Sequence, residues 1–359
     1  MKFKLSKPPL FPITVIFVLF CISLIEMYSL TYEHFPQKLF RHIAHIIASS
    51  CILIVSSSIP INFFKRYAYK IYCISLSLIC AVSLFGQTVM GAKRWLKVGL
   101  ITLQPSEIMR VALILALAKY LSNITLPDLK HTRYLIGSVI LLLVPTVFII
   151  NQPDLGTAML LIFVYVSIIF VAGVQIWKLV APLLILSITA PLIWTSLHEY
   201  QKNRILMFVN PETDPNGAGY HIIQSKIALG AGGVFGLGVF NGTQCQLDFL
   251  PEKHNDFIFS AIGEEFGFIG CVTVLALYVL LLVYNYKVAI QTKDKFSKYT
   301  VFGINAMLFF YILINIAMVC GLAPIVGVPL PFLSYGGTAL VILMFCEGLI
   351  FSIKNYLNK

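Results

Sequence analysis

The segment QCQLDFLPEKHNDFIFSAIGEEFGFIG, residues 244–270, places ionisable side chains against the start of a strongly apolar run. The run from about 257 to 286 is long enough to span a membrane. Ionisable groups at the edge of hydrocarbon are costly, so they persist mainly where they pair, line a wet cavity or do chemistry. The alternative is that they are interfacial anchors and helix-start charges. Because Pro251 ends the preceding loop, we expect the helix to begin near Asn255 or Asp256.

The composition of the whole chain is that of a membrane protein. Its 359 residues are 58% hydrophobic and 11% charged, whereas soluble domains carry about 25% charge. Ten stretches are candidate spans: about 10–30, 42–61, 69–90, 105–122, 133–150, 156–172, 176–195, 257–286, 300–322 and 333–353. The sequence therefore predicts an all-α polytopic membrane protein with about ten transmembrane helices. We expect one integral membrane domain over 1–359, with a long extracytoplasmic loop at about 196–256 between helices 7 and 8.

The basic residues predict the orientation. With the N-terminus inside, 16 of the 26 Lys and Arg residues fall in inner segments and nine in outer ones. This bias predicts that both termini are cytoplasmic. The basic start and first apolar stretch have no small-residue cleavage site after them, so we expect a retained first span rather than a signal peptide. The net charge of +11 then reflects topology and contact with anionic lipid, and it gives no reason to expect nucleic acid.

The segment GAKRWLKVGLITLQPSE, residues 91–107, departs from the orientation pattern because it carries cations on the outer side. Lys93, Arg94 and Lys97 flank Trp95, which on its own is typical of an interfacial anchor. Three cations beside it suit a phosphate-bearing ligand better than an anchor alone.

Other polar residues stand at predicted helix starts. Glu107 and Arg110 are three residues apart at the start of the fourth span, so a structural ion pair is one interpretation and a functional site another. Asp154 is expected to cap the helix that follows it. The last outer loop, GLAPIVGVPLPFLSYGGTAL, is uncharged and rich in Pro and Gly, which is typical of broken helices that line a cavity.

These outer elements together predict a chemistry. Cations from residues 93–97 and Arg204 of the long loop can hold phosphates, while Lys253, His254 and Asp256 stand at a helix mouth. A substrate with a lipid tail, a pyrophosphate and a sugar would use all of them. Asp256 is the best candidate for a general base that deprotonates a hydroxyl.

The motifs that carry these residues resemble one known family. GAKRWLKVGLITLQPSE, NQPDLGTAML, GYHIIQSK, GTQCQLDFLPEKHNDF and PLPFLSYGGT occur in the order found in SEDS proteins (shape, elongation, division, sporulation). The resemblance spans nearly the whole chain. GYHIIQSK, GTQCQLDFLPEKH and PLPFLSYGG are more similar to the elongation (RodA-like) branch than to the division (FtsW-like) branch.

The resemblance implies a peptidoglycan glycosyltransferase that polymerises lipid II outside the bacterial cytoplasmic membrane, with undecaprenyl-linked glycan as the other substrate. It implies a class B penicillin-binding protein as the crosslinking partner. The family's essential aspartate falls on Asp256 and its functionally important Trp on Trp95. Charged motif positions fall on four further residues: Lys97, Glu107, Arg204 and Lys253. Two positions depart from the family pattern: Asn255 stands for the usual Thr, and Gly236-Leu237-Gly238 for Gly-Lys-Gly, which removes a cation.

The mechanism that this resemblance implies starts with Asp256 as the base. Asp256 takes the proton of the acceptor GlcNAc 4-hydroxyl, which attacks MurNAc C1 of the donor, and pyrophosphate leaves. Basic residues stabilise the leaving group, and Mg²⁺ or another divalent cation is a further candidate with no assigned ligands. Three alternatives stay open: a lipid II flippase that uses the same cavity, a scaffold that positions the crosslinking enzyme, and a division role.

Overall fold

Long helices make up most of the described protein. The computed structural model describes residues 9–32, 36–89, 92–98, 101–125, 127–178, 195, 202, 218–250 and 252–357. Within these residues, seven helices are long and apolar enough to cross a membrane. The prediction of a helical multi-pass membrane protein is therefore confirmed. The predicted span at 176–195 and the first part of the predicted outer loop, including Arg204, fall outside the described residues except at isolated positions.

The long helices follow the apolar runs of the sequence. They are α1 (Leu10–Thr31), α2 (Pro36–Ser58), α3 (Ile61–Phe85), α4 (Pro105–Ser122), α5 (Ile136–Asn151), α6 (Leu155–Ala172), α9 (Ala218–Ala231), α11 (Ile258–Gln291), α12 (Lys295–Val319) and α13 (Gly337–Leu357). Shorter helices are η1 (Asp128–Lys130), η2 (Thr132–Tyr134) and α10 (Thr243–Gln246). Proline opens or directly precedes four of the long helices, where its missing N–H costs nothing: Pro9, Pro36, Pro60 and Pro105.

A small antiparallel sheet stands between α3 and α4, where the sequence predicted the end of a span at about residue 90 and a short connection to the next one. Its strands are β1 (Gln87–Val89), β2 (Ala92–Val98) and β3 (Ile101–Leu103), in the order β1-β2-β3. β-Branched residues at 88, 89, 98, 101 and 102 favour the extended backbone. The fold is therefore helical with one short sheet, which carries Lys93, Arg94, Trp95 and Lys97 on its middle strand.

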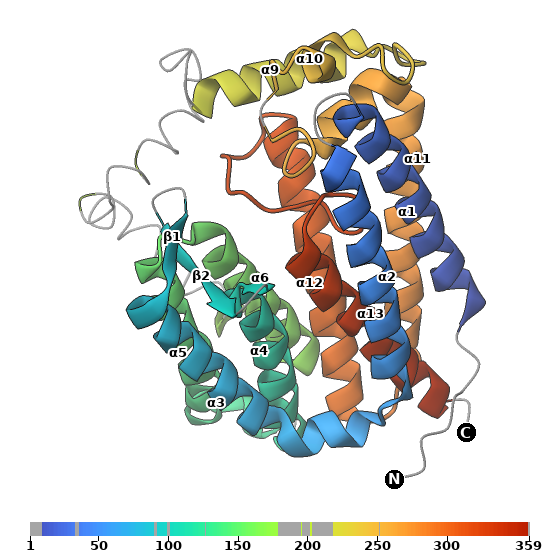
Figure 1. The fold of residues 1–359 in the computed structure, drawn as a ribbon. Coiled ribbons are helices and arrows are strands. Elements are labelled where there is room, and N and C mark those ends of the chain that lie inside the picture. Colours follow the sequence, from blue (N-terminus) through green and yellow to red (C-terminus); the bar gives the residue numbers. More distant parts are fainter. Residues whose placement is uncertain are drawn as a thin grey trace.

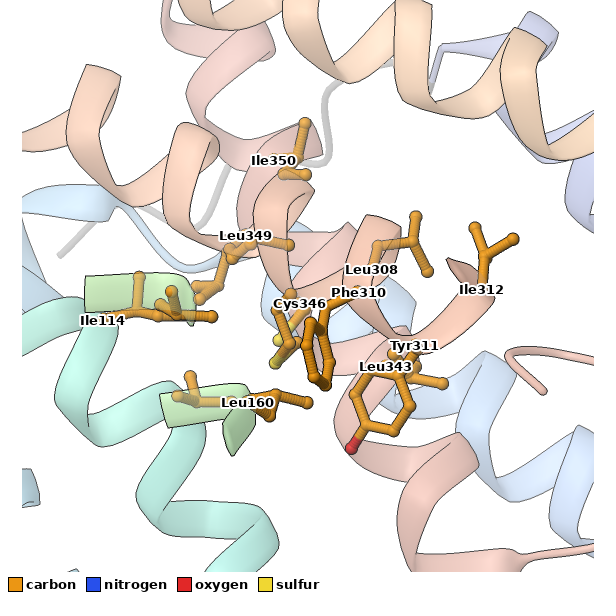
Figure 2. Close-up of a cluster of buried hydrophobic side chains, with 14 of the residues drawn as sticks. Ile114, Leu160, Leu308, Phe310, Tyr311, Ile312, Leu343, Cys346, Leu349 and Ile350 are labelled. Atoms are coloured by element: carbon orange, nitrogen blue, oxygen red, sulfur yellow. The ribbon is translucent and has the colours of Figure 1, made fainter. Parts of the chain in front are cut away.

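The two ends of the helical bundle differ in which elements they present. α1 begins and α13 ends at one end, whereas α11 begins at the opposite end, where α9 and α10 lie across the bundle (Figure 1). α2 packs against α13, α3 against α4, and α12 against α4, α6 and α11. Figure 2 shows the buried apolar cluster between these helices, with Ile114, Leu160, Phe310 and Cys346 contributed by α4, α6, α12 and α13. α12 therefore contacts both α4 and α6 on one side and α11 and α13 on the other.

Candidate functional site

A closed turn precedes α11 and carries Asp256. The amides of Asn255 and Phe257 both bond to the carbonyl of Glu252, at 2.9 and 3.5 Å. The helix therefore begins at Ile258, two to three residues later than the sequence predicted, because the chain first closes this turn. Asp256 is partly buried and lies in the turn rather than in the helix.

The backbone of Asp256 is fixed by Asn315 of α12. The Asn315 amide nitrogen Nδ2 donates to the carbonyl of Asp256 (2.9 Å) and to that of Val328 (2.8 Å). Asn315 is fully buried, so both hydrogen bonds are shielded from water. A Cβ placed on Gly327 would lie 3.7 Å from Asp256 Oδ2, so the carboxylate faces the last loop at a position without a side chain. The only sequence signal for Asn315 is that it is one of two side-chain amides, with Asn305, within an apolar span.

The same loop holds the rest of the turn. Ser334 Oγ donates to the carbonyl of Asn255 (2.6 Å), and the amide of Tyr335 donates to the carbonyl of His254 (2.9 Å). Ser334 Oγ in turn accepts from the amide of Leu330 at 2.8 Å. Sequence reasoning identified this loop as a broken helix but missed Ser334 and Tyr335 as positioning residues.

His254 is held as a neutral imidazole. Its Nε2 lies 3.1 Å from Lys38 Nζ, and because an ammonium can only donate, Nε2 accepts and the ring proton is on Nδ1. Burial lowers the pKa of His254, and the positive charge of Lys38 lowers it further. The ring centroid is 6.0 Å from that of Tyr335, which also lies 5.9 Å from both His42 and His45 of α2. Sequence reasoning did not single out those two histidines.

Lys253 bonds to the loop that precedes the Asp256 turn. Its ammonium pairs with Asp248 Oδ1 at 2.8 Å and donates to the carbonyl of Cys245, and its side chain is only 8% exposed. These contacts hold Lys253 to Cys245 and Asp248 of the preceding loop, close to the start of α11. A direct role of Lys253 in binding substrate stays a prediction.

A second polar cluster lies at the starts of α4 and α6. Arg110 Nη2 donates to Thr157 Oγ1 (2.7 Å), and Asp154 accepts from the amide (3.2 Å) and the hydroxyl (2.8 Å) of Thr157. Asp154 therefore caps α6, as predicted. Glu107 and Arg110 attract each other electrostatically, but the hydrogen bond described for the guanidinium goes to Thr157, and its centre lies 5.2 Å from the Tyr311 ring. Glu107 also interacts with Thr338 of α13.

The strand residues lie next to this second cluster. Arg94 donates through Nε to the carbonyl of Gln152 (3.1 Å) and through Nη2 to that of Pro153, which ties β2 to the turn between α5 and α6. Trp95 is partly buried and pairs with Gln87 in the sheet. Lys93 and Lys97 lie on the same strand, and their side chains fall outside what the structure describes.

Residues 320–336 join the two polar clusters. Val326 and Val328 lie against Gly156 at the start of α6, where a Cβ would come within 3.0 Å of the Val326 carbonyl oxygen. Gly327 lies against Asp256, and α13, which follows the loop, brings Thr338 to Glu107. The structure therefore brings Asp256, His254 and Lys253 together, and it connects them through an uncharged loop to Glu107, Arg110 and the β2 segment.

Comparison with known proteins identifies sequences and structures like this chain. The model of the FtsW/RodA/SpoVE family, described as a cell cycle protein, matches residues 9–359. Peptidoglycan glycosyltransferase MrdB of Escherichia coli (strain K12) is 41% identical over 319 residues, which are 88% of this chain and 85% of MrdB. A probable peptidoglycan glycosyltransferase FtsW of Buchnera aphidicola subsp. Baizongia pistaciae (strain Bp) is 32% identical over 350 residues, 95% of this chain and 92% of that protein.

Two solved structures share the architecture. One chain comes from a study of how a peptidoglycan synthase complex coordinates polymerization and crosslinking. It superposes with a TM-score of 0.86 at 26% identity and covers 98% of this chain and 99% of its own. The rod shape determining protein RodA of Thermus thermophilus superposes with a TM-score of 0.72 at 24% identity, over 96% of both chains, which supports the fold alone.

Proposed function

The chain belongs to the FtsW/RodA/SpoVE family, and from that premise we propose that it is a peptidoglycan glycosyltransferase that polymerises lipid II. The substrate class rests on the relatives that carry this activity in their names at 41% and 32% identity. The higher identity to MrdB supports a role in cell elongation rather than division.

One observation supports the catalytic assignment more than any other. The Asp256 carboxylate stands beside Gly327 in a turn whose backbone is hydrogen bonded from α12 and from the last loop. A group held in this way keeps its geometry when substrate binds, which is what a general base needs. The turn lies at the start of α11, at the end of the bundle opposite to the start of α1 (Figure 1).

The proposed reaction transfers one glycan to the next. Asp256 accepts the proton of the acceptor GlcNAc 4-hydroxyl as its oxygen forms a bond to MurNAc C1 of the undecaprenyl-linked donor. The bond between C1 and the pyrophosphate oxygen breaks, and undecaprenyl pyrophosphate leaves with that electron pair. Lys93, Arg94, Lys97 and Arg204 are the proposed cations for the pyrophosphate, with Trp95 beside them.

The contacts at the turn support further proposed roles. His254 is neutral and held by Lys38, so it is available to orient a sugar hydroxyl without competing for the proton. Lys253 fixes the loop before the turn through Asp248 and the carbonyl of Cys245. Glu107 interacts with Thr338 of α13, the helix that follows the last loop, and so supports that loop.

A divalent cation fits this site only with help from the substrate. Among the described residues, no cluster of three or more His, Cys, Asp or Glu side chains could hold a metal by itself. Mg²⁺ is commonly bound by one or two carboxylates together with phosphates and water. Asp256 is therefore the proposed protein ligand, and the ion would supply positive charge for the leaving pyrophosphate.

We further propose the topology and the partner. All 359 residues form one membrane domain of ten spans, with both termini cytoplasmic and the loop at 196–256, between spans 7 and 8, outside the bacterial cytoplasmic membrane. The start of α1 and the end of α13 at one end of the bundle agree with this arrangement. A class B penicillin-binding protein is the proposed partner, since a structure with the same fold comes from a complex that couples polymerization to crosslinking.

The first prediction tests the base. Purified Asp256→Asn protein, given lipid II in detergent, should form glycan strands about 10²–10⁴-fold more slowly than the unmodified protein, because it lacks the proton acceptor. The measurement is glycan chain length and amount by gel electrophoresis, with and without the partner and with added Mg²⁺ varied.

Glu252→Gln provides the matched control. It removes an exposed carboxylate four residues away in the same turn and should keep near-normal activity. Full activity of Asp256→Asn would end the base assignment. If the unmodified protein makes no glycan but moves lipid II across liposome membranes, it is a flippase. If polymerisation is absent while partner binding persists, it is a scaffold.

A further inference from the structure

The helix α11 is interrupted at Gly267, and another segment replaces the missing turn. Gly267 has φ 64° and ψ −160°, a conformation open to glycine alone. In a continuous helix, the amides of Phe268 and Ile269 would bond to carbonyls four residues earlier. They bond instead to the carbonyls of Gly233 and Val234, at 2.9 and 3.2 Å.

The same segment also donates hydrogen bonds to the α11 carbonyls that lose their helical partners at this break. The amide of Leu237 donates to the carbonyl of Glu264 (2.9 Å), and the amide of Gly238 donates to that of Glu265 (3.0 Å). Residues 233–238 thus satisfy four backbone groups of α11. Irregular backbone is tolerated at membrane depth only when the protein pairs its polar groups in this way.

The position of the break along α11 gives the depth of the segment. Between Glu265 and Lys287 there is no Asp, Glu, Lys, Arg or His. At about 1.5 Å per residue this stretch measures about 31 Å, close to the roughly 30 Å of bilayer hydrocarbon. Phe268 and Ile269 therefore lie just inside one boundary of the hydrocarbon, and the backbone bonds place Val234 at the same level.

The side chains of the segment suit hydrocarbon. Phe235 is 81% exposed and Phe268 is 65% exposed, and Val234 and Ile269 are exposed as well. No Asp, Glu, Lys, Arg or His occurs between Lys226 and Asp248. The apolar surface of the segment is continuous with the outward-facing residues of α11, which lie against lipid in a membrane-spanning helix.

An aromatic cluster gives the same depth independently. Tyr28 and Tyr32 at the end of α1 lie 5.0 Å apart, and Phe240 lies 5.6 and 6.4 Å from them, centroid to centroid. Exposed tyrosines at the end of a spanning helix are typical of the membrane–water interface. Phe240 is two residues after the segment, so the C-terminal end of the segment also lies at the interface.

We propose that residues 233–238 form a re-entrant lipid anchor that inserts Val234 and Phe235 among the acyl chains of the leaflet at the start of α11. The α11 residues that bond to this segment, 264–269, lie seven to twelve residues after Phe257, the last residue of the turn that carries Asp256, so the anchor fixes the depth of the α11 start. A transmembrane partner protein covering the same surface is the competing interpretation, and the test separates the two.

The test uses a photoreactive side chain in the full-length protein. Phe235→p-benzoylphenylalanine is placed in liposomes of phosphatidylethanolamine and phosphatidylglycerol, irradiated and analysed by mass spectrometry for lipid adducts. The same probe at Val279, an exposed position of mid-α11, is the reference for lipid, and the probe at Glu252 is the reference for water. The yield at 235 should match that at 279 and exceed that at 252 roughly tenfold or more, since only lipid surrounds a residue in hydrocarbon.

Two results would overturn the anchor. One is a lipid yield at 235 as low as that at 252, because the segment would then lie in water. The other is a protein adduct in place of the lipid adduct when the same variant is irradiated in cell membranes. A Val234→p-benzoylphenylalanine variant repeats the measurement, and gel filtration before reconstitution verifies that each variant is folded.

Discussion

Asn315 of α12 joins the Asp256 turn to the last loop through its side-chain amide. Both hydrogens of its amide are used, one on the carbonyl of Asp256 and one on that of Val328. Because the residue is fully buried, no water can take over these bonds if the amide is lost. Asn315 is thus a positioning residue for the proposed base.

We expect Asn315→Leu to lower the polymerisation kcat about 10–10²-fold, since small displacements of a catalytic group have effects of that size. KM for lipid II should change much less. Asn305→Leu is the matched control, because it makes the same substitution ten residues earlier on α12, where no hydrogen bond to the turn is described. An equal loss of kcat in the two variants would mean that either amide of α12 affects activity to the same extent, and the positioning role of Asn315 would be withdrawn.

At the scale of elements, α11 consists of two helical pieces that meet at Gly267, and residues 233–238 form hydrogen bonds with both pieces. Gly236 allows this close approach: its φ is +83°, and a Cβ there would lie 2.1 Å from the carbonyl oxygen of Glu265. Gly267 stands on the other side of the contact, where a Cβ would come within 2.3 Å of the Gly236 nitrogen. The two glycines therefore permit the backbone exchange described above.

Gly236→Ala should destabilise the protein by about 1–3 kcal/mol or more, because it adds backbone strain and displaces the segment from α11. Gly230→Ala is the control, since a Cβ at this exposed position of α9 would meet nothing within 4 Å. Alanine is the better helix former, so this control should be neutral or slightly stabilising. Thermal unfolding in detergent measures both, and equal Tm values for the two variants would contradict the exchange.

At the scale of the whole molecule, an ion pair closes the end of the bundle opposite to the site. Lys65 of α3 lies 3.2 Å from Asp294, whose carboxylate also caps α12 through Ser297. Burial acts to raise the pKa of Asp294, but the hydrogen bonds from Ser297 and the charge of Lys65 together bring it below the ordinary value of 3.8. The ion pair therefore joins α3 to the start of α12.

The sign of that shift predicts a pH dependence. A carboxyl whose pKa is lower in the folded state stabilises the fold fully above the ordinary pKa and loses this effect as the pH falls through the folded value. The Tm of the unmodified protein should therefore exceed that of Asp294→Asn at neutral pH, and this Tm difference should shrink as the pH falls below 3.8 and through the lower folded-state pKa.

Lys65→Met tests the cause of this pH dependence. Without the Lys65 cation, the Tm difference between proteins with Asp and with Asn at position 294 should become smaller at neutral pH. The difference that remains is the one due to the hydrogen bonds from Ser297. A Tm difference independent of pH would mean that the charge of Asp294 does not stabilise the bundle.

The sequence by itself determined the helices of this protein and some of their starts. Apolar runs of spanning length, prolines at helix openings and the Asp154 cap act through residues next to each other, so they can be read without the fold. The resemblance of the motifs also singled out Asp256 before any geometry was known.

Only the tertiary structure decided how these parts meet. The start of α11 depends on Asn315 and Ser334, each nearly 60 residues or more away, and the break at Gly267 is repaired by residues 233–238. Arg110 donates a hydrogen bond to Thr157 on another helix. In each case a buried backbone or polar group needed a hydrogen-bond partner that its own segment could not supply, and the partner's identity depends on packing between segments distant in the chain.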